Sequence, residues 1–371
     1  MPPRHIYLHI PFCARRCSYC DFSIAVRRHI PVDEYLDALR GELESRLAGT
    51  SIWEVDTLYL GGGTPSLLGG HGVARVLALL LDYVSLVDDA EITLEANPDD
   101  IAPEVVRAWV ARGVNRLSIG SQSFDDRVLT WMRRTHDASA IGRAVEAARS
   151  GGIDEISLDL IFALPESLGR DWASDLDRAI SLSPPHISVY GLTIEPMTPI
   201  GRWRDRGDLR ESPEERYEEE FLLAHERLTA VGYEHYEVSS YARPGHRARH
   251  NSSYWRRVPY LGLGPAAHSF DGEARRWNIS GYAQWADRAT AGLDPLDNGE
   301  LLGPDARAAE EAYLGLRTTD GLEISPPVAE RVQPWIDAGW ARLDRRHLRL
   351  TPAGWLRLDS LCEALTVIPS R

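Results

Sequence analysis

Three cysteines stand within eight residues near the start of the chain: Cys13, Cys17 and Cys20, in the spacing C-x3-C-x2-C. Thiolates are the usual ligands of iron–sulfur clusters, and three of them occupy only three corners of a cubic 4Fe-4S cluster. The fourth iron then stays open to the amino and carboxylate groups of S-adenosylmethionine, whose sulfonium is split by an electron from the cluster. The loop therefore predicts cluster chemistry in which the protein supplies ligands, burial and orientation.

A structural zinc site is the alternative for this loop, with His5 or His9 as the fourth ligand, because Cys3His zinc sites exist. Zinc ribbons and fingers, however, usually bring their ligands as two separated pairs, and no second pair follows here. The one other cysteine, Cys362, lies alone in an apolar pattern and is expected to be a packed thiol. No disulfide framework is available, which favours a reducing compartment.

The composition is typical of a soluble globular protein, with 371 residues of which 43% are hydrophobic and 26% charged, enough for one large domain and a smaller one. The net charge of −14 argues against a nucleic-acid partner. The sequence contains no lysine, which excludes Schiff-base chemistry. The first ten residues show no secretion signal, and the most apolar run, 73–87, is too short to span a bilayer. We therefore expect a cytoplasmic protein.

The first half of the chain alternates short apolar runs with longer helical patterns, which predicts six β-α units around a parallel sheet. Six units rather than eight predict an incomplete (β/α)6 barrel, with ligands bound at the carboxyl ends of its strands. The expected strands are Ile6–Ile10, Val55–Leu60, Glu91–Glu95, Asn115–Ile119, Ile156–Ile161 and His186–Tyr190. The expected helices are Val32–Leu47, Val73–Val84, Pro103–Ala111, Ala138–Ala148 and Trp172–Leu182.

We expect three regions in this α/β chain. The barrel occupies residues 1–195, and residues 196–300 form a helical and loop extension packed on it, with an amphipathic helix from about Tyr217 to Val231. Residues 301–371 combine helical patterns with a short alternating stretch, which predicts a small C-terminal α+β domain of winged-helix type. The acidity of the chain argues against DNA binding by that domain.

Two motifs together carry a family resemblance: the segment Tyr7-x-His9-x-Pro11-Phe12-Cys13 with its cysteine loop, and the glycine run Gly61-Gly62-Gly63-Thr64-Pro65. They resemble the radical S-adenosylmethionine superfamily, and within it the branch that contains oxygen-independent coproporphyrinogen dehydrogenase and the HemW family of heme chaperones. The resemblance spans nearly the whole chain. The glycine run also has a physical reason, because residues without side chains let backbone amides approach a ligand.

The resemblance implies a set of ligands for S-adenosylmethionine at the ends of successive strands. The cosubstrate offers an ammonium, a carboxylate, a sulfonium and hydroxyls, for which carboxylates, arginine and amides are natural partners. Taken singly, each position could be an ordinary polar residue at a strand end. The implied ligands are Tyr7, Gly62, Gly63, Thr64, Glu95, Gln122, Arg134 and Asp159.

Two departures separate the chain from the coproporphyrinogen dehydrogenases. Those enzymes carry a fourth cysteine two residues after the third, where this chain has Phe22. They also carry a long extension before the cluster loop, whereas Cys13 here is already the thirteenth residue. Both differences match the HemW pattern C-x3-C-x2-C-x-F.

The second half contains His250-Asn251-Ser252-Ser253-Tyr254-Trp255, which resembles the H-N-x-x-Y-W motif linked to heme binding in the chaperones. An imidazole can ligate heme iron, and flat rings can stack on a porphyrin, so the resemblance implies His250, Asn251, Tyr254 and Trp255 as heme-binding candidates. The alternative is a packing cluster around a hydrogen-bonded histidine. His268, in a G-x-G-x-x-A-H-S loop, is a second heme candidate.

The resemblance implies a chaperone that binds heme and delivers it to membrane-bound respiratory hemoproteins, with peripheral association at the membrane through those acceptors and a homodimer as a further expected assembly. Its cofactors would be a 4Fe-4S cluster, S-adenosylmethionine and heme. Two alternatives stay open: S-adenosylmethionine-dependent decarboxylation of coproporphyrinogen III, and radical chemistry on another substrate that shares the scaffold.

Overall fold

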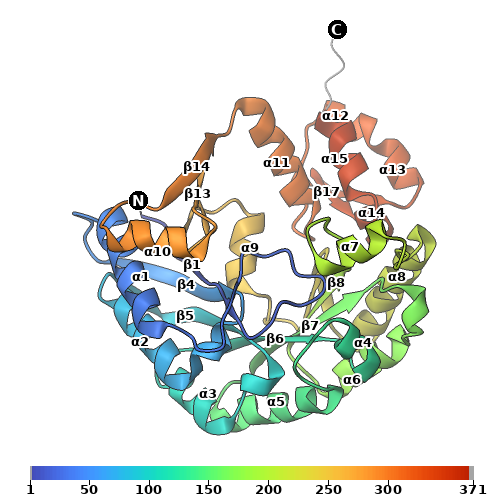
Figure 1. Cartoon of the computed structure of the whole chain (residues 1–371). Helices are drawn as coiled ribbons and strands as arrows, with labels where there is room; N and C mark the ends of the chain where they lie inside the picture. Colours follow the sequence, from blue (N-terminus) through green and yellow to red (C-terminus); the bar gives the residue numbers. More distant parts are fainter. Residues whose placement is uncertain (1, 367–371) are drawn as a thin grey trace.

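A parallel sheet forms the centre of the molecule, and this computed structural model describes residues 2–366 of the chain. All six predicted strands are present and lie side by side in chain order (Figure 1). They are β1 (His5–Ile10), β4 (Trp53–Gly62), β5 (Val84–Ala96), β6 (Arg116–Gln122), β7 (Glu155–Phe162) and β8 (His186–Gly191). The predicted partial barrel of the α/β class is therefore confirmed.

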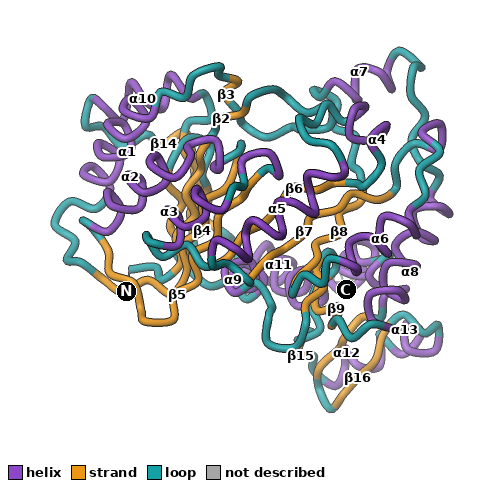
Figure 2. The backbone as a smooth tube through the Cα atoms, turned by 90° about the horizontal axis from the view of Figure 1, so that it is seen from below, coloured by secondary structure: helices purple, strands orange, loops and turns teal. Residues whose placement is uncertain are grey.

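Helices cover the outer face of these strands, as the βαβ rule requires (Figure 2). They are α1 (Val32–Arg46), α2 (Gly69–Leu81), α3 (Pro103–Val110), α5 (Ala138–Gly151) and α6 (Trp172–Ser181). The short α4 (Asp126–Trp131) lies instead at the carboxyl ends of the strands, where Val128 packs with Ile161 and Leu164. Short 3-10 turns η1 (Pro65–Leu68), η2 (Pro98–Asp100) and η3 (Glu166–Leu168) follow β4, β5 and β7. The predicted helix 73–84 begins earlier than expected, at Gly69, and it ends earlier, at Leu81, because β5 already begins at Val84.

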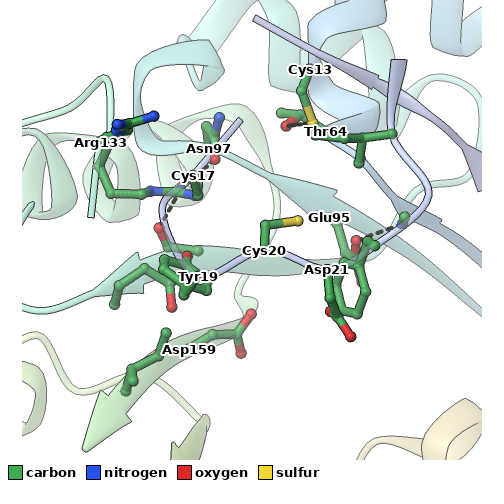
Figure 3. Close-up of a pocket in the computed structure, with 18 of the residues that line it drawn as sticks. Cys13, Cys17, Tyr19, Cys20, Asp21, Thr64, Glu95, Asn97, Arg133 and Asp159 are labelled. Carbon is green, nitrogen blue, oxygen red and sulfur yellow. Dashed lines mark hydrogen bonds between the residues drawn. The ribbon is translucent and has the colours of Figure 1, made fainter. Parts of the chain in front are cut away.

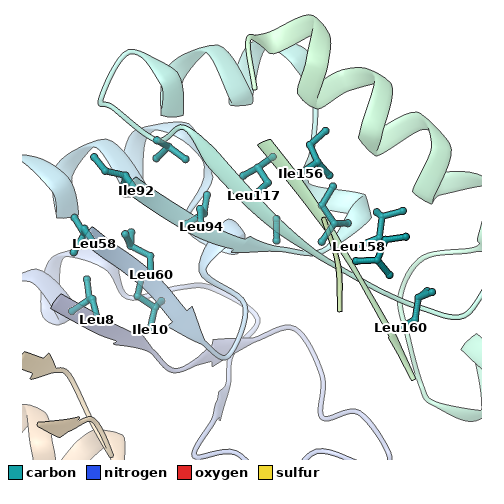
Figure 4. Packing of buried hydrophobic residues seen from close by; sticks show 14 of the residues in the cluster. Leu8, Ile10, Leu58, Leu60, Ile92, Leu94, Leu117, Ile156, Leu158 and Leu160 are labelled. Carbon is teal, nitrogen blue, oxygen red and sulfur yellow. The ribbon is translucent and has the colours of Figure 1, made fainter. Parts of the chain in front are cut away.

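The two faces of the parallel sheet differ in chemistry. Alternate residues point to opposite faces of a strand, and the outward set is aliphatic, as with Leu60 and Leu94, which pack beneath the helices (Figure 4). The inward set is polar and aromatic, as with Tyr59 and Glu95. A complete (β/α)8 barrel usually fills its interior with branched apolar side chains. The polar interior here therefore indicates a surface built to meet a ligand.

The region 196–300 extends this sheet at both edges. At one edge β11 (Tyr260–Leu263) runs parallel to β1, followed by antiparallel β12 (His268–Phe270), β13 (Ala274–Asn278) and β14 (Leu296–Leu301). At the other edge lie β10 (Ser240–Ala242) and β9 (Glu234–Glu237). The helices of this region are α7 (Pro199–Asp205), α8 (Glu214–Ala230), α9 (Arg249–Trp255) and α10 (Tyr282–Thr290). The expected extension was of helices and loops, and these six strands were not predicted.

The C-terminal region packs helices on a small antiparallel sheet with the strand order β15-β17-β16. Its elements are α11 (Pro304–Leu316), β15 (Leu322–Glu323), α12 (Pro326–Arg331), α13 (Gln333–Asp337), β16 (Ala341–Asp344), β17 (His347–Leu350), α14 (Pro352–Trp355) and α15 (Leu358–Thr366). The Trp355 indole joins this region to the rest of the chain, because its ring meets the ring of His235 on β9 at 4.5 Å. Residues 367–371 of the predicted domain lie outside the described residues.

The cysteine loop crosses the open end of the barrel as the dark-blue segment in Figure 1. Two short parallel strands, β2 (Phe12–Cys13) and β3 (Ala25–Val26), tie its two ends together. The loop is thereby held over the carboxyl ends of the parallel strands. Among the described helices, none has both the length and the apolar character needed to cross a bilayer.

Candidate cluster and cosubstrate site

A cavity of about 510 Å³ lies between the cysteine loop and the carboxyl ends of the parallel strands. All three cysteines border it, and so do seven of the eight predicted cosubstrate ligands: Gly62, Gly63, Thr64, Glu95, Gln122, Arg134 and Asp159. Residues separated by more than a hundred positions in sequence are thus brought to one space. The roles of these residues remain predictions, but the shared cavity is what such roles require.

The three thiols have different surroundings within the cavity. The Cys13 Sγ lies 3.5 Å from the Thr64 hydroxyl, and the Cys17 Sγ lies 3.5 Å from an Arg134 guanidinium nitrogen. Burial raises the pKa of the Cys13 thiol to about 11 and also raises the pKa of Cys20. Because metal-bound cysteine is a thiolate, cluster assembly at this loop must displace protons.

The arrangement of the thiols suits a cluster rather than a single ion. Figure 3 shows the three cysteines standing apart from one another around the open space. Within residues 2–366, no group of three or more His, Cys, Asp or Glu side chains is gathered in a way that could hold one metal ion. A tetrahedral zinc site needs its ligands to converge on one point, whereas a cubic cluster presents its corner irons to separated thiolates. The donor set therefore fits the predicted cluster.

The glycine run has a different local role from the one expected. The amide of Gly62 donates to Glu95, that of Gly63 to the Ile10 carbonyl and that of Thr64 to the Phe12 carbonyl. These amides are therefore used within the protein. An added Cβ at Gly62 would lie 2.6 Å from the His9 ring, and one at Gly63 would lie 2.6 Å from the Pro11 backbone. The glycines let β1 and the cysteine loop approach β4 closely.

Two half-buried carboxylates face the cavity, and neither forms an ion pair with another residue in the part of the chain that the structure describes. Glu95 accepts from the Tyr59 hydroxyl at 2.8 Å and from the Gly62 amide at 2.9 Å, while Asp159 accepts from the hydroxyls of Ser118 and Ser157 at 2.7 and 3.1 Å. Burial raises the pKa of Glu95 to about 7 and raises the pKa of Asp159 as well. Carboxylates held in this way favour a cationic ligand, and the sulfonium and ammonium of S-adenosylmethionine are such groups.

The remaining predicted ligands show strain and unmet bonding capacity. Gln122 has a φ of 64°, the left-handed region that a residue with a side chain adopts at a cost of order 1 kcal/mol. Arg134 donates to the Asn97 side chain and to the Gly120 carbonyl, yet its buried Nε has no partner among the described residues. Strained backbone and unpaired donors of this kind concentrate at functional sites.

Tyr7 alone among the predicted ligands does not border the cavity. Its ring stacks on that of Tyr59 at 6.0 Å, and its hydroxyl lies 3.0 Å from the His9 Nδ1. It therefore supports the wall rather than forming it. Several lining residues were not predicted, namely Tyr19, Tyr59, Asn97, Ser118 and Tyr190. The signal that could have found most of them is the period of two along each strand, which marks the inward positions.

The comparisons with known proteins agree with this geometry. The model described as "Radical SAM superfamily" matches residues 7–179, and that described as "HemN C-terminal domain" matches 302–357. Heme chaperone HemW of Synechocystis sp. is 39% identical over 329 residues, which cover 86% of this chain and 79% of that protein. Heme chaperone HemW of Mycobacterium tuberculosis is 36% identical over 369 residues, which cover 98% and 95%. The chain belongs to the HemW family of radical SAM proteins.

A solved structure shows that the likeness to the neighbouring branch is also close. Coproporphyrinogen III oxidase (HemN) of Escherichia coli aligns with a TM-score of 0.82 and 26% identity, covering 98% of this chain and 90% of that one. At the position where the resemblance predicted a difference from that branch, the HemW family member described here has Phe22, which is 62% exposed beside the cavity. No thiol stands there.

The motif predicted to bind heme lies in a closed environment. His250, on α9, is buried, with its Nδ1 2.7 Å from the Thr57 hydroxyl and its Nε2 2.8 Å from the Tyr254 hydroxyl. Burial lowers the pKa of its imidazole to about 3. Both ring nitrogens are thus engaged, and a bond from either to heme iron would first break one of these contacts.

The other predicted heme candidates are more accessible. Asn251 and Trp255 are half-buried on α9, and the Trp255 ring lies 4.3 Å beneath the Arg317 guanidinium. His268 on β12 is exposed and stacks on Trp277 at 5.5 Å with the ring planes 25° apart. None of the heme candidates borders the cavity that the cysteines line. In this HemW family member, cluster chemistry and any heme site built from these residues are therefore separate places.

Proposed function

We propose that the protein is a heme chaperone built on a radical SAM scaffold. Heme is its ligand, membrane-bound respiratory hemoproteins are its acceptors, and it acts as a cytoplasmic protein that associates peripherally with the membrane and forms a homodimer. The observation that supports this most is the similarity to proteins named heme chaperone HemW over 98% of the chain. Phe22 in place of a fourth cysteine agrees with it.

In this proposal the cavity holds the cluster and the cosubstrate. Cys13, Cys17 and Cys20 would ligate a 4Fe-4S cluster, which supplies an electron for cleavage of a sulfonium when both groups are bound. Glu95 and Asp159 attract and orient the cationic groups of S-adenosylmethionine. The guanidinium of Arg134 offers its unpaired Nε to an anionic or carbonyl oxygen.

His268 is the proposed axial ligand for heme, because it is the candidate whose imidazole is exposed. A histidine lone pair suits heme iron, and the Trp277 ring beside it gives the macrocycle an aromatic surface. His250 is less suited as it stands, since both of its nitrogens already have partners. The chaperone proposal itself does not depend on which histidine is used.

Heme titration of anaerobically reconstituted protein tests the proposal. We expect a saturable shift of the Soret band, retained in His250→Ala and weakened in His268→Ala. A matched control is His347→Ala, since His347 is also an exposed strand histidine but lies in the C-terminal sheet. Absence of a saturable shift in the wild type would reject the chaperone proposal.

The enzymatic alternative is decarboxylation of coproporphyrinogen III, which the structural likeness to the E. coli oxidase supports. Anaerobic incubation with coproporphyrinogen III, a reductant and S-adenosylmethionine separates the possibilities. Protoporphyrinogen formed together with 5′-deoxyadenosine and methionine would favour the enzyme. Deoxyadenosine without porphyrin turnover would favour a radical enzyme for another substrate, whereas a chaperone gives heme transfer and no porphyrin product.

A further inference from the structure

An aromatic column joins the cavity to the buried histidine of the H-N-x-x-Y-W motif. At the end of the column nearest the cavity, the Tyr59 hydroxyl donates to Glu95 at 2.8 Å. The Tyr59 ring is flanked by two others: that of Tyr7 at 6.0 Å with the planes 25° apart, and that of His250 at 5.1 Å with the planes 29° apart. The orientation of the Tyr59 hydroxyl is therefore set from both sides by ring packing.

Hydrogen bonds fix the position of His250 in addition to its ring packing. Its ring is held at both nitrogens by the hydroxyls of Thr57 and Tyr254, and its backbone amide donates to Glu91 at 2.9 Å. Glu91 lies on β5, four residues before Glu95 and on the same face of that strand. The helix α9 is thus anchored to β5, the strand that carries Glu95. The His250 ring stacks on Tyr59, whose hydroxyl donates to the Glu95 carboxylate.

Glu95 depends on this support because it has few other contacts. The donors to its two oxygens are the Tyr59 hydroxyl and the Gly62 amide, and no ion pair with a described residue fixes it. Loss of the tyrosine contact would leave one oxygen without its donor and free the side chain to change rotamer. A carboxylate meant to meet a cation in one place needs such positioning.

We propose that His250 is a positioning residue for Glu95, acting through the Tyr59 ring to orient the carboxylate toward S-adenosylmethionine, and that it does not serve as a heme ligand. This inference rests on the proposed binding of S-adenosylmethionine in the cavity. It gives the histidine of the motif a role at the cosubstrate site, although His250 itself does not border the cavity.

The test measures the dissociation constant of S-adenosylmethionine and that of heme on the same anaerobically reconstituted variants, with iron content as the check on the cluster. Tyr59→Phe keeps the ring and removes the donor, so we expect S-adenosylmethionine to bind about tenfold more weakly, the usual size for a hydrogen bond to a charged group. His250→Ala should weaken the same constant roughly fivefold, with iron content and heme affinity unchanged. Tyr254→Phe, which removes one of the two contacts on His250, should have the smaller effect.

The matched control is His235→Ala on β9. His235 is also buried, stacks on a tyrosine (Tyr241, at 4.0 Å) and has partners at both nitrogens, but it makes no contact with the column. If its loss weakened cosubstrate binding as much as His250→Ala does, general destabilisation would explain both and the inference would be overturned. His250→Ala with unchanged S-adenosylmethionine affinity, or with loss of heme binding alone, would also overturn it. A wild type that binds no S-adenosylmethionine would reject the cosubstrate proposal together with this inference, and a wild type that binds it but not heme would reject only the chaperone proposal.

Discussion

The cysteine-lined cavity and the His250 cluster, which comprises His250, Thr57, Tyr254 and Glu91, occupy the two ends of the same polar barrel interior. In the His250 cluster both imidazole nitrogens have partners within 2.8 Å. In the cavity, Glu95 and Asp159 form no ion pair with any described residue, and the Arg134 Nε has no hydrogen-bond partner among them. Satisfied polar groups stabilise a fold, whereas unsatisfied ones are retained where a ligand will pair with them. We therefore assign ligand binding to the cavity and support of the fold to the His250 cluster.

The largest expected effect concerns the cysteines of the cavity. Replacing Cys13, Cys17 or Cys20 by alanine removes one of three cluster ligands, so each variant should lose its iron and its broad visible absorbance after anaerobic reconstitution. Cys362→Ala is the control, because that buried thiol lies in α15 away from the cavity. Full iron content in all three variants would contradict the ligand assignment.

The second effect concerns the free energy of unfolding, which should fall for a substitution in the His250 cluster and rise for one in the cavity. His250→Ala removes a buried ring, leaves the Tyr254 hydroxyl without its partner and leaves the Thr57 hydroxyl with only the His5 imidazole, so unfolding in urea should become easier by about 3 kcal/mol. Asp159→Asn removes a charge that burial disfavours and keeps its shape, so the cluster-free protein should gain about 1 kcal/mol. Equal losses of stability in both variants would mean that the polar groups of the cavity are as fully hydrogen-bonded as those of the His250 cluster.

The pH dependence of stability should also run in opposite directions. The pKa of Glu95 is raised from 4.5 to about 7 by burial, so the folded state binds more protons than the unfolded chain in this window and stability falls as pH rises through it, by up to roughly 3 kcal/mol. The pKa of His250 is lowered from 6.5 to about 3 by burial. Its contribution is therefore lost as pH falls from 6.5 toward 3.

Urea unfolding of cluster-free wild type and Glu95→Gln between pH 4.5 and 8 measures the first of these slopes. The variant should be the more stable protein above pH 7 and should lose the decline that the wild type shows. Cosubstrate affinity in the wild type should rise over the same window, because a charged Glu95 attracts a cation. A wild type and a variant with parallel pH profiles would show that Glu95 is already ionised well below pH 7.

The smallest effect concerns strain. Gln122 has a φ of 64°, and glycine adopts this region without a steric cost. Gln122→Gly should stabilise the cluster-free protein by about 0.5–1 kcal/mol while weakening S-adenosylmethionine binding, since the amide side chain is lost from the cavity. Thermal unfolding and a binding titration give the two values. Lower stability in the variant would mean that the side chain, rather than a ligand, offsets the strain.

The sequence predicted the parallel strands, the cysteine loop and the residues at the strand ends because each depends on local pattern or on spacing. It did not predict β9 to β14, which are three to six residues long and partly polar, as in Ser240–Ala242 and Leu296–Leu301. Such strands exist because a neighbouring edge pairs with them, and a window of sequence does not contain that neighbour.

The chemistry of single groups was also beyond the sequence where it depends on distant partners. The motif around His250 could be read as a ligand or as packing, and only the positions of Thr57 and Tyr254 show that both nitrogens are engaged. The glycine run lies at the cavity, but the use of its amides within the protein follows from contacts with β5, β1 and the cysteine loop. Tyr59 had no motif to mark it.

The main sheet ends in β14 at one side and β9 at the other, and its strand order is linear. In a closed barrel the number and stagger of the strands fix the diameter. An open sheet is not constrained in this way, so its curvature depends on the helices packed against it. The curvature can change without the loss of a hydrogen bond between strands. The width of the ligand chamber is therefore an adjustable quantity, and filling it should change the separation between β14 and β9 at the two ends of the sheet.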